Sequence, residues 1–396
     1  MTTSFGTVPS REVIHILENA GYEAVFVGGA VRDHLLGKTA TDIDIATSAE
    51  PKEVKAVFPT TVDIGTAHGT ILVLMNGEPI EVTTYRTEGS YTDHRRPDEV
   101  HFVKSLQEDL RRRDFTINAL AMTKDGELID LFGGKADMAE RIIRAVGNAA
   151  DRFNEDALRM FRAIRFTAVL GFDIEEQTLK AIRDNATQIR YISVERLKAE
   201  MDKLFAGDYV VKAFHNIQNT GLNLHLPLFP TDTEKLNRTV PFESAVEGWA
   251  CFMIVGNFSP SDVARAYKLS NVERTFLSTV KDAYVNRMDY QFTLDDYYNY
   301  DLATLITAEK LIRSIHANGE AISFTEIKKM KQSLPIQSIA DLSVDGKKLM
   351  EWTSQKGGRW IGEWIGKIEQ AVLHGTCKND PNDIKEWFLY EFNREK

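Results

Sequence analysis

The hydrophobic residues in the first third of the chain form short apolar runs that predict β-strands. Such runs cover residues 24–27, 71–75 and 80–85. The dipeptide Asn76-Gly77 lies between the last two runs and favours a two-residue hairpin turn, because both of its positions need a positive φ. From about residue 140 the apolar residues follow a helical period almost to the end of the chain. The pattern predicts an α+β protein, with an N-terminal mixed β-sheet domain followed by an elongated, all-helical body.

The composition is that of an ordinary globular protein. Hydrophobic residues make up 43% of the chain and charged residues 27%, which excludes disordered and fibrous proteins. The formal net charge of −10 argues against a protein that coats nucleic acid through bulk charge, because that mode of binding needs many lysines and arginines against phosphates. Local basic faces remain compatible with this charge.

No segment indicates a membrane protein or a secreted one. The longest apolar stretch, residues 249–255, is too short for a membrane span, and the N-terminal segment lacks the pattern of a signal peptide. Cys251 and Cys377 show no metal-type spacing, so we expect two packed thiols and no structural zinc. We therefore expect a cytoplasmic protein with no membrane partner.

A glycine turn follows the first predicted strand. Gly28 and Gly29 lead into a short helical pattern that contains Arg32 and ends near Gly37. A helix start presents free backbone N–H groups and a positive dipole, which together with a nearby arginine suit a phosphate chain. The segment matches neither of the standard nucleotide-binding loops. A purely structural turn is the alternative interpretation.

Two aspartates follow the glycine turn at strand spacing. Asp42 and Asp44 are two residues apart, so in a strand they share a face, while Ile43 and Ile45 face the core. Two convergent carboxylates make a hard oxygen site for Mg²⁺, which phosphoryl chemistry needs for neutralising negative charge. The alternative is a solvated strand face.

Segment 154–166 has helical periodicity and carries several arginines. At about 100° per residue, its apolar residues fall in one stripe, opposite Arg159, Arg162 and Arg165. Asp156 and Arg159 would be neighbours on such a helix, either as an ion pair on a solvated face or as a fixed acceptor and donor for a base. Cytosine and adenine both offer an exocyclic amino donor next to a ring-nitrogen acceptor. An aspartate beside an arginine therefore accepts these two bases and rejects uracil and guanine.

These motifs together resemble a known family. The Gly-Gly-x-Val-Arg-Asp of residues 28–33, followed by the Asp-x-Asp of residues 42–44, is similar to the nucleotidyltransferase core of the DNA polymerase beta-like superfamily. The closer resemblance is to the class II tRNA nucleotidyltransferase/poly(A) polymerase family. Residues 111–119 (RRRDFTINA) and the Glu-Asp-x-x-Arg of residues 155–159 resemble the bacterial CCA-adding enzymes within it. The resemblance covers roughly residues 22–205.

The resemblance implies roles for individual residues. It assigns base selection to Asp156 and Arg159, and it implies that Asp42 and Asp44 are the catalytic residues and hold the metal. The remaining nucleotide-binding residues expected from the motifs are Gly28, Gly29, Arg32, Arg113, Arg162 and Arg165.

The activity that the resemblance implies is template-independent addition of C, C and A to the 3′ end of tRNA. CTP and ATP would be the substrates, and the tRNA 3′ acceptor end would be the partner. Mg²⁺ would be the cofactor, and pyrophosphate would be the second product. The alternatives are a poly(A) polymerase or a CC-only or A-only enzyme of the same family, or, from a different class, a catalytically silent RNA-binding protein. A homodimer is left open by the sequence.

Two further features lie near these motifs. The polar segment 86–97 predicts a mobile loop. CCA-adding enzymes have a flexible loop here that is needed for the final A, whereas CC-only relatives lack it, so the loop favours full CCA addition. Glu81 is either a third metal-binding carboxylate or an exposed hairpin residue.

With this resemblance, we divide the chain into four parts. Residues 1–138 form the catalytic head and residues 139–206 a nucleotide-selecting helical neck. Residues 207–300 form a helical body, and residues 301–396 a helical tail that binds tRNA. The proline-containing segment 226–230 breaks the helical pattern and is a candidate joint between helical parts.

Overall fold

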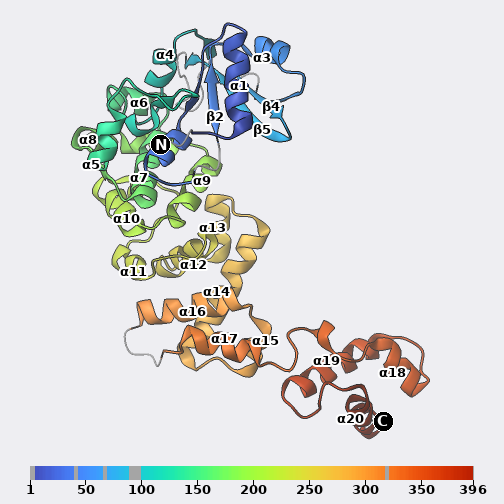
Figure 1. Ribbon diagram of the computed structural model, residues 1–396. Coiled ribbons are helices and arrows are strands. Elements are labelled where there is room, and N and C mark those ends of the chain that lie inside the picture. Colours follow the sequence, from blue (N-terminus) through green and yellow to red (C-terminus); the bar gives the residue numbers. More distant parts are fainter. Residues whose placement is uncertain (1–4, 40–42, 66–68, 89–99, 317–320, 396) are drawn as a thin grey trace. The chain divides into compact units, whose positions relative to one another are not determined.

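The computed structural model describes residues 5–39, 43–65, 69–88, 100–316 and 321–395 (Figure 1). The chain divides into two compact units. The first consists of residues 1–229, 240–245 and 266–268, and the second of residues 230–239, 246–265 and 269–396. Within the described ranges, no helix has both the length and the apolar character needed to cross a bilayer.

A seven-stranded mixed sheet forms the N-terminal part of the first unit (Figure 1). Its strand order is β3-β4-β5-β2-β1-β8-β9. The strands are β1 Ala24–Val27, β2 Asp44–Thr47, β3 Thr61–Gly65, β4 Thr70–Met75, β5 Glu78–Thr84, β8 Leu120–Met122 and β9 Leu128–Asp130. Strand β2 pairs parallel with β5, and the other neighbouring pairs are antiparallel. The predicted mixed sheet is confirmed.

The predicted strands and their hairpin turn are also confirmed. The run at residues 24–27 is β1, the run at 71–75 lies entirely in β4, and the run at 80–85 lies in β5 apart from its last residue. Asn76 and Gly77 have φ values of 53° and 83°, as the predicted turn requires. The described residues also form two small sheets: β6 Arg86–Glu88 with β7 Val100–Phe102, and β10 Ile142–Ile143 with β11 Asp173–Ile174.

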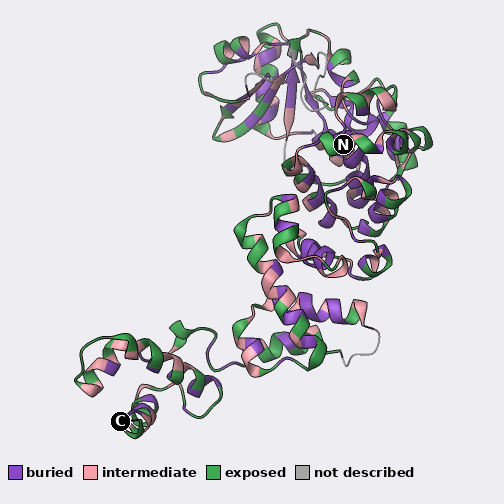
Figure 2. Ribbon diagram, turned by 180° about the vertical axis from the view of Figure 1, so that it is seen from behind, coloured by how far each residue is buried: buried purple, intermediate pink, exposed green. Residues whose placement is uncertain are grey.

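Helices cover the sheet and continue beyond it in the first unit. They are α1 Val8–Asn19, α2 Gly29–Leu35, α3 Pro51–Val57, α4 Leu106–Arg111, α5 Gly134–Glu140, α6 Ala149–Glu155, α7 Leu158–Leu170, α8 Glu176–Asn185, α9 Val194–Phe205 and α10 Val210–Asn219. Three short 3₁₀ turns lie at Thr116–Asn118, Ala186–Tyr191 and Leu222–Leu224. Helix α7 packs against α9 and α10 and is buried along most of its length (Figure 2).

The chain beyond the proline-containing segment is helical. Residues 226–230 contain no helix, so the predicted break is confirmed, and the first stretch of unit one ends at residue 229. The helices that follow are α11 Thr233–Arg238, α12 Ala245–Val255, α13 Pro260–Tyr267, α14 Asn271–Asp289, α15 Leu294–Asn299, α16 Leu302–Ile315, α17 Phe324–Gln332, α18 Gly346–Thr353, α19 Arg359–Leu373 and α20 Pro381–Arg394, with a 3₁₀ turn at Ile339–Asp341. The prediction of a helical body after a mixed sheet is confirmed.

Capping side chains and an apolar core explain why the last of these helices form. Asp345 and Asp380 accept hydrogen bonds from the first backbone N–H groups of α18 and α20. The apolar faces of α18, α19 and α20 meet in a core that includes Leu349, Trp364 and Phe388.

Candidate active site

A cavity of about 570 Å³ lies in the first unit, between the sheet and the helices α2, α7 and α9. It is lined by every predicted site residue that the structure describes: Gly28, Gly29, Arg32, Asp44, Arg113, Asp156, Arg159, Arg162 and Arg165. Asp42 lies outside the described residues. Residues that are up to 137 positions apart in the sequence therefore meet in one place.

The glycine turn lies at the end of β1 and begins α2. Gly28 is the N-cap of α2 and has φ 75° and ψ −139°, a conformation that only glycine adopts without strain. A Cβ atom at Gly28 would lie 3.0 Å from Nη1 of Arg113. The turn needs glycine both for its backbone conformation and for the approach of this arginine.

Acidic side chains occupy the sheet side of the cavity. Asp44 on β2 and Glu81 on β5 are direct partners in the parallel register, and both line the cavity. Glu81 is exposed. Among the described residues no group of three or more His, Cys, Asp or Glu side chains is arranged to hold a metal ion. The two carboxylates present are hard oxygen donors on adjacent strands, a type of ligand that suits a divalent metal ion.

Asp109 lines the cavity and anchors two arginines there. Its side chain is 1% exposed, and Oδ1 accepts a hydrogen bond from Nη2 of Arg112 at 2.7 Å. Oδ2 accepts from Nη2 of Arg113 at 3.1 Å. Burial raises the pKa of Asp109, but the charges and hydrogen bonds of the two arginines outweigh it and lower the pKa overall. The carboxylate therefore stays charged and holds both guanidinium groups in place.

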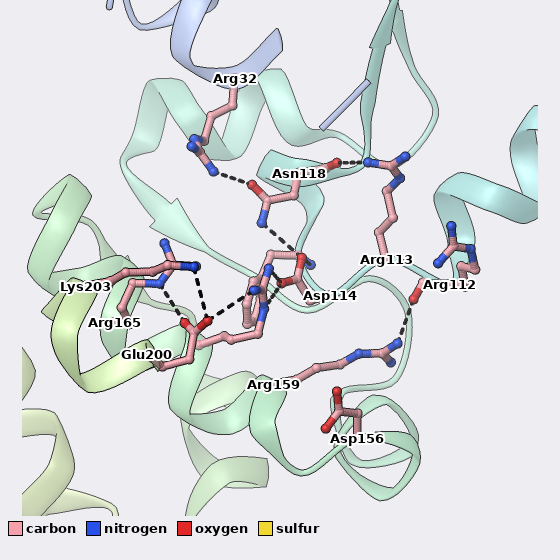
Figure 3. Close-up of polar contacts among 12 residues, drawn as sticks. Arg32, Arg112, Arg113, Asp114, Asn118, Asp156, Arg159, Arg165, Glu200 and Lys203 are labelled. Atoms are coloured by element: carbon pink, nitrogen blue, oxygen red, sulfur yellow. Dashed lines mark hydrogen bonds and ion pairs between the residues drawn. The ribbon is translucent and has the colours of Figure 1, made fainter. Parts of the chain in front are cut away.

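Asp114 connects the glycine turn to helix α7 (Figure 3). Its Oδ2 accepts from Arg162 Nε at 2.8 Å, and its Oδ1 accepts from Asn118 Nδ2 at 3.0 Å. Asn118 Oδ1 in turn accepts from Arg32 Nη1 at 2.6 Å. Burial raises the pKa of Asp114, but Arg162 and these hydrogen bonds lower it to about 2. This chain of contacts fixes an arginine from α2 and an arginine from α7 on the same cavity.

Glu200 on α9 holds the next arginine of α7 (Figure 3). Its Oε2 accepts from Arg165 Nε at 2.9 Å, and its Oε1 lies 3.6 Å from Nη1 of Arg162. The guanidinium carbon of Arg165 lies 3.6 Å from the centroid of the Phe166 ring, within the range of a cation–π contact. Burial, the largest influence, lowers the pKa of Arg165, and the charge of Glu200 opposes this shift.

The placement of Asp156 differs from the prediction. The sequence pattern placed Asp156 and Arg159 on one helix, but Asp156 has an extended backbone (φ −142°, ψ 103°) between α6 and α7, and α7 begins at Leu158. The physical reason is local capping, because the Asp156 carboxylate accepts from the backbone N–H of Leu158 at 3.0 Å. Its main side-chain partner is Arg196 of α9, whose Nη2 donates to Oδ2 at 2.6 Å.

Arg159 is not on a solvated face. It is 7% exposed, so the alternative of an exposed surface pair is wrong for this residue. Its guanidinium donates to Glu155 Oε2 at 2.5 Å, to the backbone oxygen of Arg152 at 3.2 Å and to the backbone oxygen of Arg112 at 3.0 Å. These contacts fix Arg159 on the cavity wall beside Asp156 (Figure 3).

Sequence reasoning missed the residues that hold the predicted ones: Asp109, Asn118, Arg196 and Glu200. Arg196 and Glu200 are four residues apart, so they share one face of α9. The sequence carried this spacing signal. It carried no sign that the partners lay 35 and 40 residues earlier in the chain.

Comparison with known proteins gives three matches to described families. Residues 24–144 match the poly A polymerase head domain, and residues 171–231 match the probable RNA and SrmB-binding site of polymerase A. Residues 240–388 match the putative tRNA nucleotidyltransferase domain 2.

Relatives match over nearly the whole chain. A CCA-adding enzyme of Bacillus cereus (strain G9842) is 42% identical over 384 residues, which cover 96% of this chain and 97% of the relative. A CCA-adding enzyme of Bacillus anthracis is 42% identical over 390 residues, with coverages of 97% and 98%. The crystal structure of the Bacillus stearothermophilus CCA-adding enzyme in complex with CTP is 38% identical, with a TM-score of 0.82 and coverages of 98% and 97%.

These matches define a class of protein: the fold, and the matches over nearly the whole chain, are those of a template-independent nucleotidyltransferase. The chain belongs to the family of CCA-adding enzymes. The resemblance inferred from the sequence motifs is confirmed.

Proposed function

We propose that this chain adds C, C and A to the 3′ end of tRNA, using CTP and ATP and releasing pyrophosphate. The observation that carries the proposal is the single cavity that contains an aspartate–arginine pair, a group of buried arginines and two strand carboxylates. The similarity to CCA-adding enzymes, and to one solved in complex with CTP, supports it.

Asp156 and Arg159 select the base of the incoming nucleotide. The aspartate accepts a hydrogen bond from the exocyclic amino group of cytosine or adenine, and the arginine donates to the adjacent ring nitrogen. Both side chains line the cavity and are held by hydrogen bonds, so they present a preformed edge to the base. Uracil and guanine place a carbonyl oxygen and an N–H group at these positions and leave both protein groups unpaired.

The glycine turn and the arginines around it bind the triphosphate. Gly29 offers a backbone N–H group at the start of α2, whereas the N–H of Gly28 donates to the Leu120 backbone oxygen at 3.3 Å. Arg32 lies in the last turn of the same short helix and lines the cavity. Arg113, Arg162 and Arg165 contribute further positive charge on the same cavity: each is anchored by a buried or nearly buried carboxylate. Arginines held in this way neutralise phosphate charge at little cost of reorganisation.

The metal site of this proposal is made of carboxylates. Asp42 and Asp44 would hold Mg²⁺, and the register partner of Asp44, Glu81, is the candidate for a third ligand. When bound, a divalent ion would neutralise charge on the phosphate oxygens of the nucleotide. Asp42 and Asp44 are accordingly proposed as the catalytic residues.

The reaction is attack of the tRNA 3′-hydroxyl oxygen on the α-phosphorus of the nucleotide. A new bond forms between these two atoms, the hydroxyl proton is released to solvent, and the bond from the α-phosphorus to the bridging oxygen of the leaving pyrophosphate breaks. The protein's own contribution is to fix the base between Asp156 and Arg159 and the phosphates on the arginines, so that the hydroxyl and the phosphorus meet in line.

The four parts of the chain receive roles on this proposal. Residues 1–138 are the catalytic head and residues 139–206 the nucleotide-selecting neck. Residues 207–300 and 301–396 form the helical body and tail, which hold the tRNA mainly through its shape and phosphates. Only residues 86–88 of the predicted loop segment 86–97 are described, and they form strand β6, so the loop prediction is wrong for these three residues. We place the enzyme in the cytoplasm, because both cysteines are buried free thiols.

Incubation of the purified protein with tRNA transcripts that end before, within and after CCA tests the proposal. We expect C to be added to transcripts that lack CCA or end in one C, A to those that end in CC, and nothing to complete ones. Long A tails would indicate a poly(A) polymerase. Binding of tRNA without any incorporation would indicate a catalytically silent RNA-binding protein. Either result would overturn the proposal.

A further inference from the structure

Helix α9 contributes a side chain that reaches the base-selecting aspartate from outside its own segment. Arg196 lies in the first turn of α9 and lines the cavity. Its Nη2 donates to Oδ2 of Asp156 at 2.6 Å and its Nη1 donates to Oδ1 at 3.2 Å. This two-point contact between guanidinium and carboxylate is the strongest and most directional arrangement available to an arginine.

Asp156 needs such a contact if its carboxylate is to have a fixed orientation. It lies between two helices rather than within one, so a helical backbone does not set the direction of its side chain. The backbone N–H of Leu158 donates to Oδ1 at 3.0 Å, which fixes one oxygen but leaves rotation of the carboxylate plane. The second contact, made by Arg196 to Oδ2, removes that rotation.

The same contacts determine which acceptor position is left for a base. A carboxylate accepts about four hydrogen bonds, two on each oxygen. Among the described residues, Oδ1 accepts two, from Leu158 and Arg196, and Oδ2 accepts one, from Arg196. The remaining acceptor position is therefore on Oδ2.

We propose that Arg196 is a specificity-determining positioning residue: it orients Asp156 so that a single acceptor site on Oδ2 meets the exocyclic amino group of cytosine or adenine. This inference rests on the proposed function, and it assigns selectivity to a residue outside the segment that touches the base. Without Arg196, the Asp156 carboxylate can rotate. Its free acceptor position is then no longer fixed opposite the exocyclic amino group, and cytosine is no longer favoured over uracil.

The test compares single-nucleotide addition by the full-length protein with CTP and with UTP, on a tRNA transcript that lacks its last three nucleotides. We expect Arg196→Met to lower the ratio of kcat/KM for CTP to that for UTP by roughly tenfold, the order of one misplaced base-edge contact. Arg196→Lys, which keeps the charge but not the two-point contact, should fall between this variant and the unmodified protein. Lys198→Met, on the same helix and paired with Asp202 at 2.8 Å, is the matched control and should keep the ratio.

A merely structural role for Arg196 gives a different result. In that case kcat/KM falls equally for both nucleotides, the ratio stays constant, and the proposal is overturned. If Arg196→Met does not fold, Arg196→Lys carries the same comparison. In an Asp156→Asn background, Arg196→Met should change the ratio by less than about twofold, because the two residues act as one unit. A full tenfold change in that background also contradicts the proposal.

The unmodified protein separates this inference from the function on which it rests. Preferential addition of C by the unmodified protein, with an unchanged ratio in the variants, overturns only the role of Arg196. An unmodified protein that adds no C to the transcript overturns the proposed function itself.

Discussion

Replacement of Asp114 by asparagine should destabilise the first unit by about 2 kcal/mol at pH 7. The pKa of Asp114 is about 2, compared with 3.8 for an aspartate without its contacts, and this difference corresponds to about 2 kcal/mol. Asp114 is 8% exposed, so solvent screens the interaction with Arg162 little. Asparagine keeps the size of the side chain and removes its charge.

The destabilisation should depend on pH in one direction. Because the pKa of Asp114 is lowered by folding, its contribution is complete above pH 4 and is lost as the pH falls from about 4 through about 2. At pH 3 the difference between the variant and the unmodified protein should therefore shrink to about half. Other carboxyl groups titrate in both proteins, and their effects cancel in the difference.

Urea unfolding can assign this effect to the first unit. All five tryptophans of the chain lie in the second unit, so tryptophan fluorescence reports that unit, whereas far-UV circular dichroism reports both. We expect Asp114→Asn to shift the circular dichroism transition and to leave the fluorescence transition in place. Asp184→Asn, which removes an exposed pair with Lys180, is the control and should cost less than about 1 kcal/mol.

Two results would refute this reasoning. A variant as stable as the unmodified protein at pH 7 would mean that the buried pair of Asp114 and Arg162 contributes nothing net. A deficit that is equally large at pH 3 would mean that the loss comes from packing or hydrogen bonding and not from the charge.

Three further predictions concern single substitutions. Asp44→Asn should lower the rate of nucleotide incorporation by at least roughly a hundredfold without changing the circular dichroism spectrum. The reason is that the variant loses the several kcal/mol of charge stabilisation that a bound metal would provide. Incorporation near the rate of the unmodified protein would contradict the catalytic role of Asp44. Gly28→Ala should weaken CTP binding, measured by calorimetry, and lower the free energy of unfolding by about 1–3 kcal/mol. The reason is that φ at Gly28 is 75° and that the new Cβ atom would lie 3.0 Å from Nη1 of Arg113. Unchanged CTP binding would show that the turn tolerates a side chain. Lys331→Met should lower the free energy of unfolding of the second unit by about 2 kcal/mol, measured by tryptophan fluorescence. The reason is that the Lys331 ammonium group donates to three backbone oxygens at the end of α15. A loss below about 0.5 kcal/mol would mean that water replaces these hydrogen bonds.

The local parts of the fold were predictable from the sequence because their signals are local. The apolar run at residues 24–27 has no polar interruption, and it is β1. Asn76 and Gly77 adopt the positive φ values that their turn requires. The residues that line the cavity were predictable for a different reason. Each predicted residue that the structure describes belonged to a motif whose residue types suit binding of a phosphate, a metal ion or a base.

The environment of those residues was not predictable, because it depends on contacts between distant segments. Arg159 looks like a surface residue in a helical projection, but it is buried and donates to Arg152 and Glu155 of α6 and to the backbone oxygen of Arg112. Asp156 looks like part of the same helix, but it accepts a hydrogen bond from Leu158 and breaks the helix there. Arg196 had no visible partner in the sequence, since Asp156 lies 40 residues earlier.

The measurement that tests the central claim most directly is an experimental structure of this protein with CTP bound. The account predicts that N4 of cytosine lies within hydrogen-bond distance of the Asp156 carboxylate and N3 within hydrogen-bond distance of the Arg159 guanidinium, with the triphosphate on the Gly28–Gly29 turn. A cytosine ring bound away from both side chains would contradict the claim that the protein itself takes the place of a template strand.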